Sequence, residues 1–585
     1  MLNKVIPDPS SSQCTTLAVE WMRNCADHHN CAATSSLNLR SSTRFLYLDP
    51  NNEDVALVKF LPHQAPREWV ALSYRWGTDQ AVMLTHSNLA ELQEGIQVHD
   101  LDHTIQDAIF IVRALGLEYL WVDALCVLQD GSREDWLAQS SKMREVYEKS
   151  TVTLVAVDSP SVRHGFLEPR DQQYVPLKWS LESSLDELDA SGSLDAYLSE
   201  AWDPVRDRLR GPWAERGWTF QEGLLPNRLL YYSATQMLWK CCAETRYERG
   251  LKVSPMDEIA DDFADEGGRN FWGFDLFTKV KLMPRYVQTL AQDTRGEKHR
   301  LWYELVEEYS GRCLGNFSDR SIAISGLAAK YQDFLGTDRY LAGLWKDDII
   351  RGLLWHVVDA KVFDEPNRDG GVDRVWQCPS WSWLGMAAGR TVRNDHAAYM
   401  DCRLIARVRD IQIVYEKPSH SFGNVRQAVL SLQGPTLLFN RLYTAGWRSW
   451  TSLSAFERHV SHLIEDEHGE RAASFAGEGR FAAVLMLQHF PSVDHRLDVL
   501  VLEAANGAGA AVPQFRRLGV VRLCYFDEKL KASPGLLTRY RTVQDSLPYR
   551  LGLHPGFRRM KITQAKAVFN ELSNQRWPDQ TLLVT

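Results

Sequence analysis

The chain has 585 residues, more than one hydrophobic core accommodates, and its length is typical of about three or four domains. Apolar residues make up 44% of it and charged residues 24%, the proportions of a water-soluble globular protein. The net charge of −9, from 66 basic and 75 acidic residues, disfavours nucleic acid and anionic membrane surfaces as partners.

Cysteine usage and the first residues of the chain predict an intracellular protein. Ten cysteines are too few for a disulfide framework in a chain of this length, and the N-terminus lacks the apolar core of a signal peptide. No uncharged apolar stretch reaches the roughly 18 residues that a membrane span needs. We therefore expect a cytoplasmic protein without a membrane span.

One short segment near the N-terminus holds four potential metal ligands, namely Cys25, His28, His29 and Cys31. Their spacing could place several of them around one zinc ion. Zinc needs about four ligands, however, and no second pair of ligands lies close by in the sequence. The segment from residue 21 to 36 is therefore predicted to be a small capped helix with buried thiols, and no metal is expected.

Two short apolar runs each end in a cluster of polar and aromatic residues. The first spans residues 69–77 and the second 119–130, within which Tyr119–Val127 has the nearly continuous apolar character of a strand covered on both faces. Residues 104–116 have helical periodicity and a glycine stop. A second helix is predicted over 134–150 and a strand over 151–157.

This alternation of strands and helices predicts a parallel sheet with right-handed crossovers. In such sheets ligands bind at the carboxyl ends of the strands, which is where the polar clusters fall. We therefore expect Tyr74 and Asp123, distant in the sequence, to lie around one site, and Glu222 is expected at the same rim of the sheet.

The rest of the chain changes character several times. Residues 170–210 form an acidic insertion of low periodicity, and strands are expected at 228–232 and 236–242. Helical patterns dominate from about residue 271 to 358. Beyond residue 400 the apolar residues recur with a period of two, which predicts an antiparallel β region.

Several of these segments together resemble the fungal heterokaryon incompatibility (HET) domain family. The matching segments are Ala71–Gly77, Thr104–Ile109, Tyr119–Cys126, Met143 with Tyr147, and Arg216–Glu222. The resemblance implies an α/β fold with a parallel sheet flanked by helices, like that of Toll/interleukin-receptor (TIR) domains. It also implies a role in nonself recognition between hyphae, with cell death after unlike individuals fuse. The family usually has other residue types at Arg75, Asp102 and Leu128.

Four domains are expected on this basis. They are an N-terminal extension (1–64), the HET domain (65–245), a mainly helical region (246–390) and a β-rich C-terminal domain (391–585).

The catalytic candidate is Glu222, and the expected pocket residues are Ser73, Tyr74, Trp76, Asp123, Gln129, Arg216, Trp218 and Gln221. A carboxylate beside the indole of Trp218 could stabilise the positive charge that develops when a glycosidic bond to nicotinamide breaks. Glu222 could equally form an ionic brace with Arg216, and both alternatives remain open.

The other residues of this group also allow two interpretations. A charge such as Asp123 at the end of a buried strand needs a partner, and pairing with Arg216 is favoured over binding a ligand hydroxyl. Tyr74 and Trp76 could line a nucleotide pocket or belong to the aromatic core. Cys126 has no base near it in the sequence, so we expect an inert buried thiol.

No phosphate-binding glycine loop, metalloprotease motif or esterase motif occurs in a fitting context. The sequence therefore predicts a signalling protein that acts through self-association or a protein partner, with no resident cofactor. The alternatives are a TIR-like hydrolase with NAD as substrate and a HET-type enzyme of small-molecule biosynthesis.

Overall fold

The computed structural model describes residues 3–29, 31, 39, 42–77, 82–131, 133–170, 175–179, 194–198, 211–253, 275–289, 297–336, 338–357, 378–386, 390–394, 402–418, 420–439, 481–489, 494–504, 514–526 and 579–584. The chain forms two compact units, Met1–Thr289 and Leu290–Thr585.

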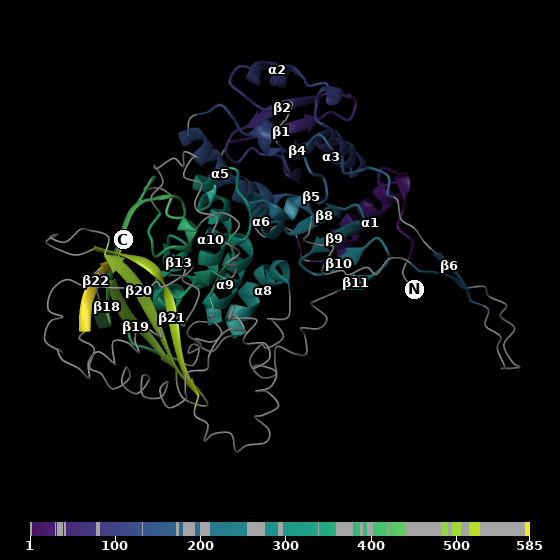
Figure 1. The fold of residues 1–585 in the computed structure, drawn as a ribbon. Coiled ribbons are helices and arrows are strands. Elements are labelled where there is room, and N and C mark those ends of the chain that lie inside the picture. The colour runs from purple at the N-terminus through teal and green to yellow at the C-terminus, as the bar shows by residue number, and fades with distance from the viewer. Residues whose placement is uncertain are drawn as a thin grey trace, which may run out of the picture. The chain divides into compact units, whose positions relative to one another are not determined.

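The first unit is built on a nine-stranded mixed sheet (Figure 1). Its strands are β1 (Thr43–Leu48), β2 (Val55–Phe60), β3 (Val70–Ser73), β4 (Tyr119–Trp121), β5 (Val152–Ala156), β8 (Arg228–Tyr232), β9 (Met237–Cys241), β10 (Thr245–Tyr247) and β11 (Lys252–Val253). They lie in the order β11-β10-β9-β8-β5-β3-β4-β1-β2.

The centre of this sheet is parallel and its two edges are antiparallel. Strand β3 pairs in parallel with β4 and β5, and β5 pairs in parallel with β8. Every residue of β3 and β5 is buried, as expected for strands covered on both faces. The predicted parallel sheet is thus present at the centre, while β1, β2 and β9 to β11 extend it with antiparallel pairing.

The helices of the first unit are α1 (Ser12–His28), α2 (Leu89–Glu94), α3 (His103–Ala114), α4 (Asp123–Cys126), α5 (Arg133–Lys149), α6 (Gly217–Leu224) and α8 (Leu276–Thr289), with short 3-10 turns at Val98–Asp100 and Pro212–Glu215. The predicted helix at 104–116 is confirmed as α3, which buries Ile105, Ala108 and Val112 on one face. It stops before Gly116, whose φ of +74° favours glycine.

The expected continuous strand over Tyr119–Val127 is wrong in its second half. Strand β4 ends at Trp121, and the next residues form the single helical turn α4. The amides of Leu125 and Cys126 both donate to the carbonyl of Val122, which closes this turn. A short apolar run cannot by itself distinguish a buried strand from a buried helix.

Part of the expected acidic insertion forms a pair of β-strands. Strands β6 (Val175–Trp179) and β7 (Leu194–Leu198) form an antiparallel two-stranded sheet. The remainder of the expected insertion at 171–174, 180–193 and 199–210 lies outside the described residues.

The second unit contains α9 (Glu297–Ser310), α10 (Ile322–Leu335), α11 (Ile349–Gly352) and 3-10 turns at Phe317–Asp319, Lys346–Asp348 and Trp383–Gly385. Two small antiparallel sheets accompany them, β12 (Tyr340–Leu341) with β13 (Leu344–Trp345), and β14 (His356–Val357) with β15 (Val392–Arg393). The helix α11 is shorter than the apolar run at 349–358 suggests, because the chain turns at Leu353 and then enters β14.

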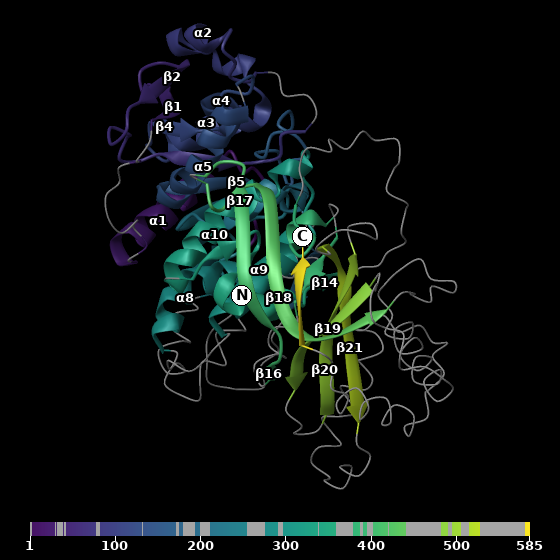
Figure 2. The ribbon, with the colours of Figure 1, turned by 90° about the vertical axis from the view of Figure 1, so that its left-hand side faces the viewer.

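The β-rich part of the second unit is a seven-stranded sheet (Figure 2). Its strands are β16 (Cys402–Leu404), β17 (Arg407–Tyr415), β18 (Val425–Phe439), β19 (Phe481–His489), β20 (Asp494–Ala504), β21 (Gln514–Phe526) and β22 (Asp579–Val584). Pairing of β18 with both β19 and β22 closes five of them into a ring. Most of these strands coincide with the predicted period-two runs.

The chain is therefore a mixed α/β protein with helices beside its large sheet and further β-sheets toward its C-terminus. Among the helices in the described parts of the chain, none combines the length and the apolar character that crossing a bilayer requires. The strands β1 and β2 belong to the large sheet, although the sequence suggests an extension separate from the α/β domain before residue 65.

Candidate functional site

The inner part of the candidate site is a chain of hydrogen bonds between three segments. Trp213 Nε1 donates to Ser73 Oγ at 2.6 Å, and Ser73 Oγ donates to Glu222 Oε2 at 2.5 Å. Ser73 is the last residue of β3, Trp213 lies in the 3-10 turn before α6, and Glu222 lies on α6. These bonds fasten α6 over the carboxyl end of β3.

Glu222 lies in surroundings that oppose its ionisation. Burial raises the pKa of its carboxyl group to about 7, and the negative charge of Asp123 acts in the same direction. The charge of Arg216 and the hydroxyl groups of Ser73 and Tyr147 offset part of this effect. A carboxyl group with such a pKa can hold or release a proton near neutral pH.

The outer part of the site is centred on Asp123, the first residue of α4. Trp76 Nε1 donates to its Oδ2 at 2.8 Å, and the Ala124 amide donates to its Oδ1 at 2.8 Å. Burial raises the pKa of Asp123, while the charge of Arg216 and a hydrogen bond with Tyr74 oppose the shift. Arg216 NH1 donates to the Tyr74 carbonyl at 2.6 Å.

Arg216 therefore contributes to both carboxyl groups by its charge and holds the backbone after β3. Its guanidinium lies 5.9 Å from the centre of the Trp76 ring, within range of a cation–π contact. The charge of Arg216 lowers the pKa of Asp123, and direct pairing of the two side chains stays a prediction.

Burial separates the site into an interior and a rim. The interior residues Ser73 and Glu222 are 0% and 3% exposed. Around them the rim is half-buried and comprises Trp76, Asp123 and Arg216, and the half-buried Trp218 lies one turn before Glu222 on α6. The three residues expected to converge, Tyr74, Asp123 and Glu222, lie in one network at the carboxyl ends of β3 and β4.

The remaining predicted residues differ in how they relate to this network. Gln129 Nε2 donates to the carbonyls of Val127 and Asp123, so its side chain holds the loop after α4. Gln221 on α6 is 1% exposed, and its Oε1 makes no hydrogen bond within the described residues. Cys126 is buried, and burial raises its pKa to about 12, as expected of an inert thiol.

Sequence reasoning missed two members of the network. Trp213 is the donor to Ser73, and Tyr147 on α5 donates to the Leu72 carbonyl at 3.1 Å and acts on Glu222. Tyr147 was visible only as part of a helical family segment. Trp213 stands three residues before Arg216, and its proximity to that motif is the signal that could have indicated it.

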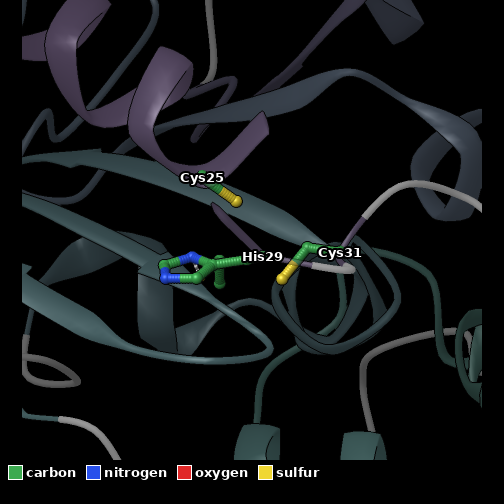
Figure 3. Close-up of side chains that lie close together, drawn as sticks. Cys25, His29 and Cys31 are labelled. Carbon is green, nitrogen blue, oxygen red and sulfur yellow. Dashed lines mark hydrogen bonds between the residues drawn. The ribbon is translucent and has the colours of Figure 1, made fainter. Parts of the chain in front are cut away.

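A second cluster of polar side chains lies elsewhere in the first unit. Cys25, His29, Cys31 and Cys241 place their ligand atoms within 4.8 Å of one another. Figure 3 shows the first three gathered at the end of α1. A fourth potential ligand, which the sequence did not show close by, is Cys241 from β9, and His28 is not part of the group.

Comparison with protein families matches residues 69–222 to the family described as heterokaryon incompatibility protein (HET). This range begins just before β3 and ends at Glu222, so it contains the residues that form the buried network. Residues 69–222 therefore match the HET domain family, and this match confirms the resemblance drawn from the sequence. Neither the curated proteins nor the solved structures gave a match.

Proposed function

We propose that this protein acts in nonself recognition between fungal hyphae and signals programmed cell death after unlike individuals fuse. The observation that carries the proposal is the HET domain at residues 69–222, whose conspicuous polar residues are joined in one buried network. The role requires a protein partner, either an incompatibility factor or a second copy of the chain. It also requires the protein to be in the cytoplasm, where the contents of fused cells mix.

The burial of the network favours a role through protein association over a role through chemistry. Glu222 is 3% exposed, and its Oε2 accepts the hydrogen bond from Ser73. In this state a substrate has little access to the carboxyl group. The network then supports the shape of the domain, and the surface around it makes the contacts with a partner.

Expression of the full chain from an inducible promoter in a fungal host tests this role. We expect loss of viability after induction with wild type, and the same loss with Glu222→Gln if the fold is intact. The matched control is Glu215→Gln, which alters an exposed carboxyl group seven residues earlier. Normal growth at protein levels confirmed by immunoblot would contradict the proposal.

A TIR-like hydrolase of NAD is the second candidate, and the pKa of Glu222 favours it. A carboxyl group that titrates at about 7 behind a half-buried rim of Trp76 and Arg216 could act on a ribosyl bond. Water would attack the ribose carbon and give up a proton to the Glu222 carboxylate, while the bond to nicotinamide breaks and neutral nicotinamide leaves with the bonding electrons. The rim aromatics would stack on the base.

Release of nicotinamide from NAD by the purified full chain distinguishes the two candidates. The hydrolase predicts turnover that Glu222→Gln abolishes and Glu215→Gln preserves. Cell death with intracellular NAD unchanged supports the association role. A HET-type enzyme of small-molecule biosynthesis would give neither cell death nor nicotinamide release, and nothing in the described site favours it.

A further inference from the structure

Three thiols and one imidazole from two distant parts of the sequence meet in the first unit. Cys25 lies in the last turn of α1, His29 and Cys31 follow that helix, and Cys241 ends β9. The four ligand atoms lie within 4.8 Å of one another, and the three cysteines are buried. In Figure 3 the side chains of Cys25, His29 and Cys31 gather on one side of the helix end.

The distance between Cys241 Sγ and His29 Nδ1 fits tetrahedral coordination. Zinc bonds of about 2.3 Å to sulfur and about 2.0 Å to nitrogen place a sulfur and a nitrogen ligand about 3.6 Å apart at the tetrahedral angle. Cys241 Sγ and His29 Nδ1 are 3.5 Å apart. Three cysteines with one histidine are also a common ligand set of structural zinc, in which no position is left for water.

The surroundings are those of a metal centre with fixed ligands. The other imidazole nitrogen, His29 Nε2, lies 3.7 Å from Glu244 Oε2, the side on which zinc-binding histidines usually have a carboxylate. Glu244 is itself held by Arg246 and by Lys252, whose Nζ is 2.9 Å from its Oε2.

A positive charge also lies beside the sulfur atoms. Arg228 Nε donates to Cys25 Sγ at 3.2 Å, and Arg228 stands directly opposite Cys241 in the pairing of β8 with β9. Zinc with three thiolates and a neutral imidazole carries one net negative charge, which this guanidinium balances. Three uncharged thiols would give a guanidinium no charge to balance.

We propose that Cys25, His29, Cys31 and Cys241 bind one zinc ion that fastens the N-terminal helix to the edge of the large sheet. The ion links α1 to β9 across more than two hundred residues of sequence. It is separate from the HET network, so its presence does not depend on the proposed function. A cluster of free thiols and a disulfide between two of the cysteines are the competing states.

Metal analysis of the full chain purified without affinity metals tests the proposal. We expect about one zinc per chain by inductively coupled plasma mass spectrometry. Exchange with Co²⁺ should give the intense visible bands of a tetrahedral site with thiolate ligands. Less than about a tenth of an equivalent of metal, with no uptake of Co²⁺, would overturn it, as would a disulfide detected by mass spectrometry under reducing purification.

Variants separate metal ligation from simple packing. His29→Ala should lower the zinc content several-fold, and His29→Cys should restore it, because a four-cysteine site also binds zinc. Cys241→Ser should lose the metal, whereas Cys14→Ser, at a buried thiol near the start of α1, should keep it. If the cysteine variants do not fold, the two His29 variants decide, and equal zinc contents in both would overturn the assignment.

Discussion

At the residue scale, Glu222 makes the stability of the HET domain depend on pH. Its folded-state pKa of about 7 lies above the ordinary value of 4.5. Its contribution to stability is therefore fully present below about pH 4.5 and is lost as the pH rises through about 7. We expect Glu222→Gln to remove this loss, which is worth about 3 kcal/mol at most.

Urea unfolding at pH 5 and pH 8, monitored by hydrogen exchange in peptides that cover α6, measures how the stability of each protein depends on pH. The variant should be less sensitive to pH than wild type, and Glu215→Gln should behave as wild type. An equal pH dependence in wild type and Glu222→Gln would show that Glu222 titrates normally.

Ser73 joins the indole of Trp213 to the carboxyl group of Glu222. In Ser73→Ala the donor of Trp213 and the acceptor of Glu222 both lose a buried partner, at a cost of about 1–3 kcal/mol for each. Since the Ser73 hydroxyl lowers the pKa of Glu222, this pKa should also rise above about 7 in the variant. Thermal unfolding between pH 5 and pH 8 measures both effects. Ser161→Ala, which removes an exposed bond to His164, is the control.

The convergence of Tyr74 and Asp123 could be predicted because parallel strands end at the same edge of a sheet. Glu222 lies on α6, and it was expected there only from its place in a family motif. Trp213 and Tyr147 could not be found in the same way, since a buried hydroxyl or indole partner follows from packing and leaves no local pattern. Cys241 was missed for a related reason. Metal ligands far apart in sequence have no spacing rule, and only the pairing of β9 with β8 brings Cys241 to α1.

At the element scale, continuous apolar runs predicted the central strands and a period of 3.6 predicted α3, whereas α4 was mistaken for strand. The run after Trp121 is apolar in every residue from Ala124 to Val127, so it has no periodicity to read. What ends β4 there is the turn closed on the Val122 carbonyl, together with the bonds that Asp123 makes.

The position of α1 on the sheet should depend on zinc. Incubation of the full chain with a strong zinc chelator removes the bond between α1 and β9, so amides from Cys25 to Cys31 should exchange at least tenfold faster. Peptides of α6 should change little, because α6 packs on β3 and α8. The apparent melting temperature should fall as well, and added Zn²⁺ should restore it. Unchanged exchange after verified metal removal would show that α1 is held by packing alone.

At the scale of the whole molecule, the first compact unit extends further than the expected boundary at residue 245. Strands β10 and β11 continue the sheet beyond β9, and α8 packs on α6. Lys281 on α8 donates to the Leu225 carbonyl at the end of α6 at 2.8 Å. Strands β10 and β11 are too short to show a periodicity, and the pattern of α8 does not say which domain it packs on. The sequence could therefore not assign these elements to the domain that precedes them.

Glu248, just beyond residue 245, contributes to the stability of the first unit. Its carboxylate accepts hydrogen bonds from Arg170 and from the amides of Ile6 and Met237, each at 2.6 Å, and the Arg170–Glu248 pair is almost fully buried. A fragment that ends at residue 245 lacks Glu248 and leaves the Arg170 guanidinium buried without it. Breaking a buried pair from one side costs about 3–5 kcal/mol, a large part of the stability of a domain.

We therefore expect the fragment 1–289 to fold and the fragment 1–245 to aggregate or be degraded. Expression of both with the same tag, followed by gel filtration and thermal unfolding, measures the difference. The substitution Glu248→Gln in 1–289 should reproduce much of the loss, whereas the exposed pair of Arg75 and Glu215 should be dispensable. In the fungal host, cell death caused by 1–289 but not by 1–245 would place the effector in the complete first unit. Equal folding of the two fragments would show that the HET domain is stable without β10, β11 and α8.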